Sequence, residues 1–255
     1  DAETLDTVRK NVGYFIAYDN LFSTWISKGS DFKADDVTVA LQAFSRLIDP
    51  HHKKVFDGVF ATLQTGLSKL GESSGARTKA IRDLIYLIKD IPMDDKQDYD
   101  VLGFIYEYLI SNFAANAGKK AGEFFTPAEV STLLAKLTKS KAGSRIYDPT
   151  CGSGSLLIKA GREVGDNNFS LYGQEANGST WALAVMNMYL HGYDSAIIRW
   201  GDTLRNPKHK ESENLMLFDT VVANPPFSLD KWGADELMHD QYNRFWRGLP
   251  PKSKG

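Results

Sequence analysis

The stretch "RIYDPTCGSGSLLI", residues 145–158, decides the fold class. It begins with a short run typical of a buried strand, and Asp148 ends that run. A turn containing Gly152 and Gly154 follows, and an apolar, helix-like segment opens near Ser155. Strand, glycine turn and helix in this order indicate the ligand-facing edge of a parallel sheet, where glycines let the backbone approach a ligand closely.

Three more strand-like runs follow: "FSLYGQE" (169–175), "AIIRWGD" (196–202) and "FDTVVAN" (218–224). Helix-like segments follow the strand-like runs 145–148 and 169–175, whereas the run 196–202 is followed only by the polar stretch 203–214. Alternating strands and helices predict βαβ crossovers and a parallel sheet. We therefore predict an α/β, Rossmann-like domain over residues 119–255.

Residues 4–118 have a different hydrophobic pattern and are predicted to be helical, because apolar residues recur at three- and four-residue spacing. The clearest runs are residues 37–48, 55–70, 78–91 and 100–118. "GESSG" (71–75) predicts a flexible joint between two of these helices. The sequence thus predicts a helical N-terminal domain, residues 1–118, ahead of the α/β domain.

Composition excludes several classes of protein. The 255 residues are 42% hydrophobic and 24% charged, as in a globular protein with a proper core. The net charge of −2 gives no overall basic footprint for nucleic acid. The single cysteine excludes a disulfide framework, and no metal-ligand spacing is present. No run approaches the ~18 apolar residues of a membrane span, and no signal peptide opens the chain, so we expect a cytoplasmic protein.

Two more acidic residues follow strand-like runs, Glu175 in "YGQEAN" and Asp202 in "WGDTL". A carboxylate placed as Glu175 is can accept hydrogen bonds from ribose hydroxyls, although a solvated loop acid fits equally well. Asp202 taken alone reads as a helix N-cap or turn residue. Together with Asp148 they line one sheet edge, as a nucleoside-bearing cofactor requires. The dinucleotide fingerprint fails, because no third glycine follows Gly154, and there is no P-loop.

The stretch "FDTVVANPPFSLDKW" (218–232) ends a strand in Asn224-Pro225-Pro226-Phe227. Neither proline has the N–H that a central strand needs, and each fixes φ. The chain therefore leaves the sheet along one stiff path, with an amide and an aromatic ring held at the strand end. After it, residues 229–255 interleave basic and aromatic side chains, which suits a loop that contacts a nucleic-acid strand. A surface loop with buried tryptophans is the equal alternative.

At these residues the sequence resembles the amino-group DNA methyltransferases that use S-adenosylmethionine. Their hallmark is [Asn/Asp/Ser]-Pro-Pro-[Tyr/Phe/Trp]; "DPTCGSG" fits the adenine-modifying branch, and "GEFFTP" (122–127) precedes the glycine turn in their γ order. With "GQEAN", "MNMYLHG", "GDTL" and "ANPPF", most of residues 100–255 is similar to the modification (M) subunit of prokaryotic type I restriction–modification systems. That family has further strands after the NPPF loop. The chain also begins without Met, so we expect it to be a truncated part of a longer protein.

The resemblance implies a function and its residues: methyl transfer from S-adenosylmethionine to N6 of adenine in a specific DNA sequence. The implied catalytic residues are Asn224, Pro225, Pro226 and Phe227. Those implied for cofactor binding are Phe125, Thr126, Pro127, Asp148, Gly152, Gly154, Glu175 and Asp202. No metal is needed, because the leaving group is already positively charged. No Pro-Cys pair is present, so Cys151 is interpreted as a small packed residue and not as the nucleophile of a cytosine-C5 enzyme.

The resemblance also implies partners: double-stranded DNA, a specificity (S) subunit, a second M subunit and a restriction (R) subunit. Two alternatives stay open at this point. One is an N-methyltransferase with a non-DNA substrate such as a release-factor glutamine, since NPP-aromatic motifs occur there too. The other is a fragment that binds cofactor and partners without turnover. A methylation assay with duplex DNA against protein substrate separates the first alternative, and cofactor binding without methyl transfer would indicate the second.

Overall fold

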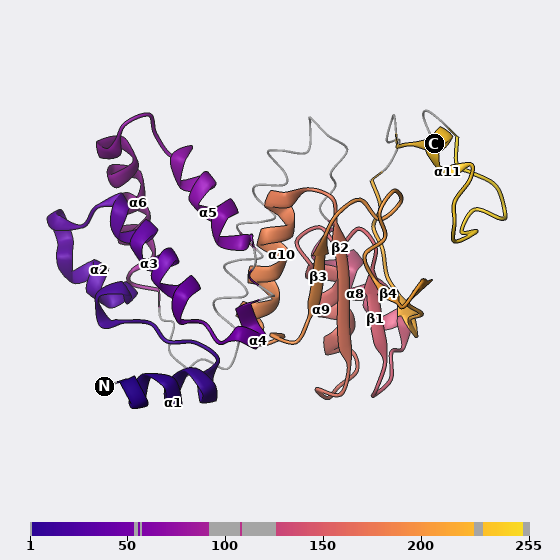
Figure 1. Cartoon of the computed structure of the whole chain (residues 1–255), viewed down its shortest axis with the longest axis horizontal. Coiled ribbons are helices and arrows are strands. Elements are labelled where there is room, and N and C mark those ends of the chain that lie inside the picture. The colour runs from indigo at the N-terminus through magenta and orange to yellow at the C-terminus, as the bar shows by residue number, and fades with distance from the viewer. Residues whose placement is uncertain are drawn as a thin grey trace. The chain divides into compact units, whose positions relative to one another are not determined.

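The computed structural model describes residues 2–53, 56, 58–91, 108, 126–226 and 232–251 (Figure 1). Contacts divide the chain into two compact units, Asp1–Gln97 and Asp98–Gly255. Sequence analysis places the boundary later, at 118/119. Nearly all of 92–125 lies outside the described residues, so that boundary stays a prediction.

The first unit is helical, as predicted. Its elements are α1 (Ala2–Val12), η1 (Tyr18–Asn20), α2 (Phe22–Lys28), η2 (Gly29–Asp31), α3 (Ala34–Leu47), α4 (Pro50–Lys53), α5 (Val59–Ser68) and α6 (Ser74–Ile88). Its core contains Phe32, Ala34, Ile81 and Ile85, against which Phe22, Trp25, Ile26, Val37 and Leu67 pack. The predicted helix 100–118 lies outside the described residues except for Tyr108, which is helical.

Three helix starts in this unit differ from the sequence prediction: α3 begins three residues before the predicted run, and the starts of α5 and α6 have the local causes given next. Helix α5 begins only at Val59, because Gly58 before it has a left-handed backbone (φ 83°). Helix α6 begins at Ser74, inside the stretch predicted as a flexible joint. The Ser73 side chain accepts a hydrogen bond from the Ala76 N–H at 3.1 Å and so caps the helix.

The second unit contains a four-stranded parallel sheet in the order β3-β2-β1-β6. The strands are β1 (Arg145–Asp148), β2 (Ser170–Glu175), β3 (Ile197–Trp200) and β6 (Thr220–Val221). All four were predicted as strands, and the α/β class is confirmed. The last strand is shorter than predicted, although the Asp219 and Val222 N–H groups still bond to the β1 carbonyls of Arg145 and Tyr147.

Helices cover one face of this sheet (Figure 1). Helix α9 (Ser155–Arg162) packs on β1 and β2, α10 (Gly178–Leu190) packs on β2 and β3, and the two helices contact each other. Helix α8 (Ala128–Thr138), which was not predicted, packs along α9. The other elements are the antiparallel pair β4 (Lys210–Glu211) and β5 (Asn214–Leu215), and α11 (Ala234–Leu237). The β4–β5 pair lies near the end of the stretch after β3 that was predicted only to be polar.

Candidate active site at the carboxyl edge of the sheet

The parallel sheet brings the predicted site residues to one edge. Asp148 ends β1 and Glu175 ends β2, and the register pairs Asp148 with Gly173. Asp202 lies two residues after β3, and Asn224 three residues after β6. The carboxyl ends of parallel strands share one edge, which is where open α/β sheets bind ligands. The expected placement of the three acids is therefore confirmed, while their roles stay predictions.

The two glycines of the turn differ in the space around them. Both have left-handed backbones, with φ of 55° at Gly152 and 82° at Gly154. A Cβ on Gly154 would lie 2.5 Å from Cε of Met188, so this glycine permits α9 and α10 to pack closely. Within the part of the chain that the structure describes, a Cβ on Gly152 would meet nothing within 4 Å. Gly152 is thus the position where the turn is open to a ligand.

Glu175 joins the glycine turn to the end of β2. Its Oε2 accepts a hydrogen bond from the Gly152 N–H at 3.0 Å, and its Oε1 accepts one from the Asn177 N–H at 2.7 Å. These bonds fix the plane of the carboxylate at the sheet edge.

Asp148 is a buried acid, with only 2% of its surface exposed. Burial raises the pKa of its carboxyl group from 3.8 to about 7, and the neighbouring Glu175 adds to that increase. A hydrogen bond from the Thr150 N–H to Oδ1, at 2.9 Å, acts in the opposite direction. The site therefore holds a carboxyl group that titrates near neutral pH.

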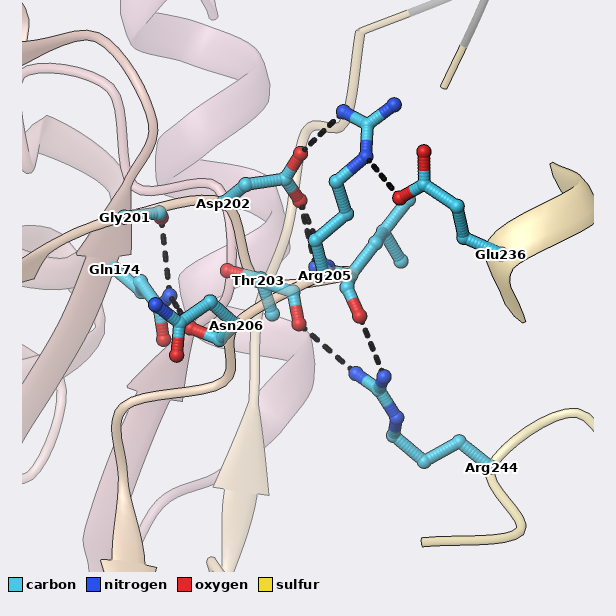
Figure 2. A network of polar contacts seen from close by, with 9 residues as sticks. Gln174, Gly201, Asp202, Thr203, Arg205, Asn206, Glu236 and Arg244 are labelled. Atoms are coloured by element: carbon cyan, nitrogen blue, oxygen red, sulfur yellow. Dashed lines mark hydrogen bonds and ion pairs between the residues drawn. The ribbon is translucent and has the colours of Figure 1, made fainter. Parts of the chain in front are cut away.

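Asp202 lies at the start of a turn, as the more cautious interpretation of the sequence suggests (Figure 2). Its Oδ1 accepts hydrogen bonds from the N–H groups of Leu204 and Arg205, at 2.8 and 3.2 Å. Its Oδ2 forms an ion pair with the Arg205 guanidinium at 3.1 Å. We call residues 202–206 the Asp202 turn. Its first residue has a fixed carboxylate, although Asp202 already has several partners within the turn.

A buried glutamine that the sequence motifs do not single out, Gln174, lies beside this turn (Figure 2). Gln174 has no exposed surface. Its Nε2 donates to the carbonyls of Gly201 and Asn206, at 3.0 and 2.9 Å, and its Oε1 accepts from the Lys208 N–H at 2.9 Å. A buried amide with all these bonds fixes both ends of the Asp202 turn. Its signal in the sequence was a glutamine inside the strand "SLYGQE".

The NPPF loop and the "GEFFTP" segment meet at a hydrogen bond. Nδ2 of Asn224 donates to Oγ1 of Thr126 at 2.9 Å, across 98 residues of sequence. Pro225 and Pro226 are exposed beside Asn224. Pro127 is the N-cap residue of α8, and its carbonyl accepts a hydrogen bond from the Ser131 N–H at 2.9 Å. Phe125 and Phe227, predicted for the cofactor and the base, lie outside the described residues.

Cys151 is a packed residue, as predicted. The side chain is buried, its backbone N–H bonds to the Gln174 carbonyl at 3.0 Å, and burial raises the pKa of its thiol well above the ordinary value. Within the described residues, no group of three or more His, Cys, Asp or Glu side chains is arranged to hold a metal ion. The same part of the chain contains no helix long and apolar enough to cross a membrane.

A parallel sheet with a glycine turn and acids at its carboxyl edge defines the Rossmann-like class of ligand-binding α/β proteins. Within that class, residues 97–255 match the family described as N-6 DNA Methylase, and the chain belongs to this family.

Curated relatives and solved structures agree with this assignment. The type I restriction enzyme MpnII methylase subunit of Mycoplasma pneumoniae is 34% identical, over 100% of this chain and 52% of its own. The HindI methylase subunit of Haemophilus influenzae is 36% identical, over 60% of this chain and 34% of its own. A type I restriction–modification methyltransferase subunit from Streptococcus thermophilus superposes with a TM-score of 0.82 at 31% identity, over 99% of this chain and 54% of that one. The chain thus spans between a third and about half of the length of these relatives.

Proposed function

We propose that this chain is the cofactor-binding and catalytic region of the modification subunit of a type I restriction–modification system. In this proposal it transfers a methyl group from S-adenosylmethionine to N6 of adenine in a specific DNA sequence. The observation that carries the proposal is the Asn224–Thr126 hydrogen bond of 2.9 Å, because it joins the two predicted motifs at the sheet edge that bears the acids. The family match and the names of the relatives support the same reaction.

The residues at this edge fit a nucleoside-bearing cofactor. The turn is open above Gly152, and the Glu175 carboxylate beside it is fixed by two backbone bonds, so it can accept bonds from ribose hydroxyls. We assign the adenine amino group to Asp202. There it would add to, or replace, the bond from Arg205, whose side chain is 41% exposed and therefore weakly held. When bound, S-adenosylmethionine supplies a methyl group activated by a sulfonium.

The chain's own residues then have to orient the adenine amino nitrogen, which is a poor nucleophile because its lone pair is delocalised into the ring. The Thr126 hydroxyl accepts a hydrogen bond from Nδ2 of Asn224. This bond fixes the orientation of the amide and therefore the position of its acceptor oxygen, Oδ1. We propose that Oδ1 and the Pro225 carbonyl accept hydrogen bonds from the two amino N–H groups and favour a tetrahedral, attacking nitrogen, which loses one proton as its bond to the methyl group forms and the sulfonium becomes a neutral thioether. The prolines hold these acceptors in place before reaction, and Phe227 would stack on the extruded base.

Cofactor binding gives a direct test of the proposed edge. We expect Glu175→Ala to weaken S-adenosylmethionine binding by about 10-fold or more, because hydrogen bonds to a charged group contribute roughly 1.5–3 kcal/mol. Asp202→Ala should also weaken S-adenosylmethionine binding. Isothermal titration calorimetry of the full-length protein measures both. Glu163→Ala, which removes an exposed acid at the far end of α9, is the matched control and should bind normally. Unchanged affinity in both Glu175→Ala and Asp202→Ala would remove the cofactor assignment.

We also propose that the protein works in a complex. The chain has a net charge of −2, whereas affinity for DNA comes largely from phosphate contacts and specificity from base contacts. A specificity subunit would supply most of both. A second modification subunit and a restriction subunit complete the proposed assembly, and the helical unit is a candidate docking surface.

The full-length protein alone is therefore expected to methylate a defined DNA site slowly or not at all, and an added specificity subunit should restore the rate. Transfer of a labelled methyl group to duplex DNA with and without that subunit measures this. Rapid methylation of one defined site by the protein alone, with no gain from the added subunit, would instead indicate a self-sufficient methyltransferase.

A further inference from the structure

Arg244, in the segment after the NPPF loop (residues 232–251), donates two hydrogen bonds to the backbone of the Asp202 turn (Figure 2). Arg244 donates from NH1 to the Thr203 carbonyl at 2.9 Å and from NH2 to the Leu204 carbonyl at 2.5 Å. Both acceptors belong to the backbone of the turn, directly after Asp202. One planar guanidinium group therefore fixes the positions of two successive peptide units.

The other edge of the same guanidinium is held within the segment. Nε and NH2 of Arg244 donate to the Asp240 carboxylate at 3.1 and 2.8 Å, and the Arg244 N–H donates to Oδ2 at 2.8 Å. The side chains of Arg244 and Asp240 are only 20% and 6% exposed. Arg244 lowers the pKa of the Asp240 carboxyl group, so the acid is ionised at neutral pH. Asp240 thus holds the guanidinium plane that the turn binds.

Apolar packing supports this contact. Trp232, Ala234 and Leu237 form a buried cluster in the segment, and Leu204 from the Asp202 turn packs against it together with Phe245 and Leu249. A second polar link runs from Asp202 through Arg205 to Glu236, at 3.1 and 2.9 Å. The residues of that link are 36–66% exposed, so it contributes little. Arg244 is accordingly the stronger of the two polar connections.

The contact also reaches the glycine turn. The hydroxyl of Thr203, whose carbonyl Arg244 binds, donates to the Pro149 carbonyl. Pro149 directly follows Asp148. The chain of bonds from Arg244 through Thr203 to Pro149 therefore connects residues 232–251 with two of the segments that bear predicted cofactor residues, the Asp202 turn and the glycine turn.

We propose that Arg244 is a positioning residue, which holds the Asp202 turn, and through it the Asp202 carboxylate, in the geometry that binds the cofactor's adenine. This inference rests on the proposed function. It replaces the interpretation of Arg244 as a contact to DNA, because Asp240 and the two carbonyls engage its guanidinium. The segment 232–251 also carries three carboxylates against two guanidinium groups, which does not favour a phosphate-binding surface.

The first test needs no cofactor. Hydrogen exchange of the Leu204 and Arg205 amides, which the Asp202 carboxylate protects, should become about 10-fold faster in Arg244→Ala of the full-length protein. Arg247→Ala is the matched control, since Arg247 is exposed and lies over the Trp246 ring at 4.4 Å from its centroid. Its exchange should match that of the wild type. Unchanged exchange in Arg244→Ala would overturn the proposal.

The second test asks whether Arg244 acts through Asp202. We expect Arg244→Ala to raise the dissociation constant for S-adenosylmethionine about 10-fold in the wild-type background, but less than about 2-fold in an Asp202→Ala background. Equal effects in the two backgrounds would mean that Arg244 only stabilises the fold, and would also overturn the proposal. Should Arg244→Ala unfold the segment, Arg244→Lys keeps the charge beside Asp240 but cannot bond both carbonyls. It should change exchange and affinity in the same direction.

The two readouts distinguish a failure of this inference from a failure of the proposed function. If the wild-type protein does not bind S-adenosylmethionine, the proposed function fails and the adenine-positioning role of Arg244 fails with it. The exchange experiment still decides whether Arg244 holds the turn.

Discussion

Replacing Asn224 by alanine is expected to slow methyl transfer by about 100- to 1,000-fold, equivalent to roughly 3–4 kcal/mol of barrier, by analogy with the loss of one oxyanion-hole donor. Cofactor affinity should stay within about 2-fold, because in the proposed mechanism Asn224 Oδ1 contacts the acceptor base and not the cofactor. Single-turnover transfer to duplex DNA, with the specificity subunit present, measures the chemical step. Calorimetry on the same samples measures cofactor affinity.

Two further variants show whether the orientation of the amide matters. Thr126→Val removes the acceptor that holds Nδ2 and should lower the rate less than Asn224→Ala, because the acceptor oxygen remains but can rotate away. Asn168→Ala removes an exposed asparagine before β2 and should change neither rate nor affinity. Near-normal turnover in Asn224→Ala would exclude the catalytic role of the NPPF loop.

The sheet and the edge that bears the candidate site could be predicted from local sequence because each βαβ unit is encoded in a contiguous stretch. "RIYD" predicted β1 at its observed bounds, and the acid at the end of each of the first two strands follows from that assignment. Parallel pairing then brings distant strand ends together without further information. For the same reason Asp148, Glu175 and Asp202 could be placed at one edge.

Residues that act through partners far away in the sequence could not be predicted. Arg244 binds carbonyls 40 and 41 residues earlier, and its pattern in the sequence was indistinguishable from that of a basic surface residue. The role of Gln174 could not be predicted, because it consists of three hydrogen bonds to the backbone in and beside the later Asp202 turn. Both depend on tertiary placement, which periodicity does not report.

Helix α8 shows a different limit. It buries the small residues Ser131 and Ala135, whereas Leu133 and Leu137 are 58% and 67% exposed. The usual expectation that the larger apolar side chains face the core would therefore orient this helix wrongly. Small side chains on its buried face suit close packing along α9, and Lys159 of α9 donates to the Ser131 hydroxyl at 2.8 Å.

Asp148 should make the stability of the α/β unit depend on pH below neutrality. In the folded protein its carboxyl group has a pKa of about 7, whereas in the unfolded chain it has the ordinary value of 3.8. Between these values the folded state holds a proton that the unfolded state has released, so the free energy of unfolding falls as pH rises. The difference corresponds to about 4 kcal/mol, fully present as stability below pH 3.8 and lost above pH 7.

Asp148→Asn should remove this dependence, because an amide does not titrate and its oxygen can still accept the Thr150 N–H. The amide nitrogen adds buried donors, which cost roughly 1–3 kcal/mol, but that cost is the same at every pH. The informative quantity is therefore the difference in the free energy of unfolding between wild type and variant, measured by urea unfolding from about pH 4 to pH 8. It should shift by about 4 kcal/mol in favour of the variant as pH rises. A constant difference would show that the Asp148 pKa is not raised.

The same titration links stability to the proposed chemistry. A cationic cofactor beside Asp148 would favour its ionised form, so binding should release a proton near pH 6–7 and become tighter as pH rises through that range. In Asp148→Asn this proton release should disappear, whereas Glu163→Ala should retain it. Calorimetry in buffers of different ionisation enthalpy counts the protons. If the wild type releases none, Asp148 either ionises before the cofactor arrives or stays protonated beside it, and in both cases its burial serves the fold and not the binding of charge.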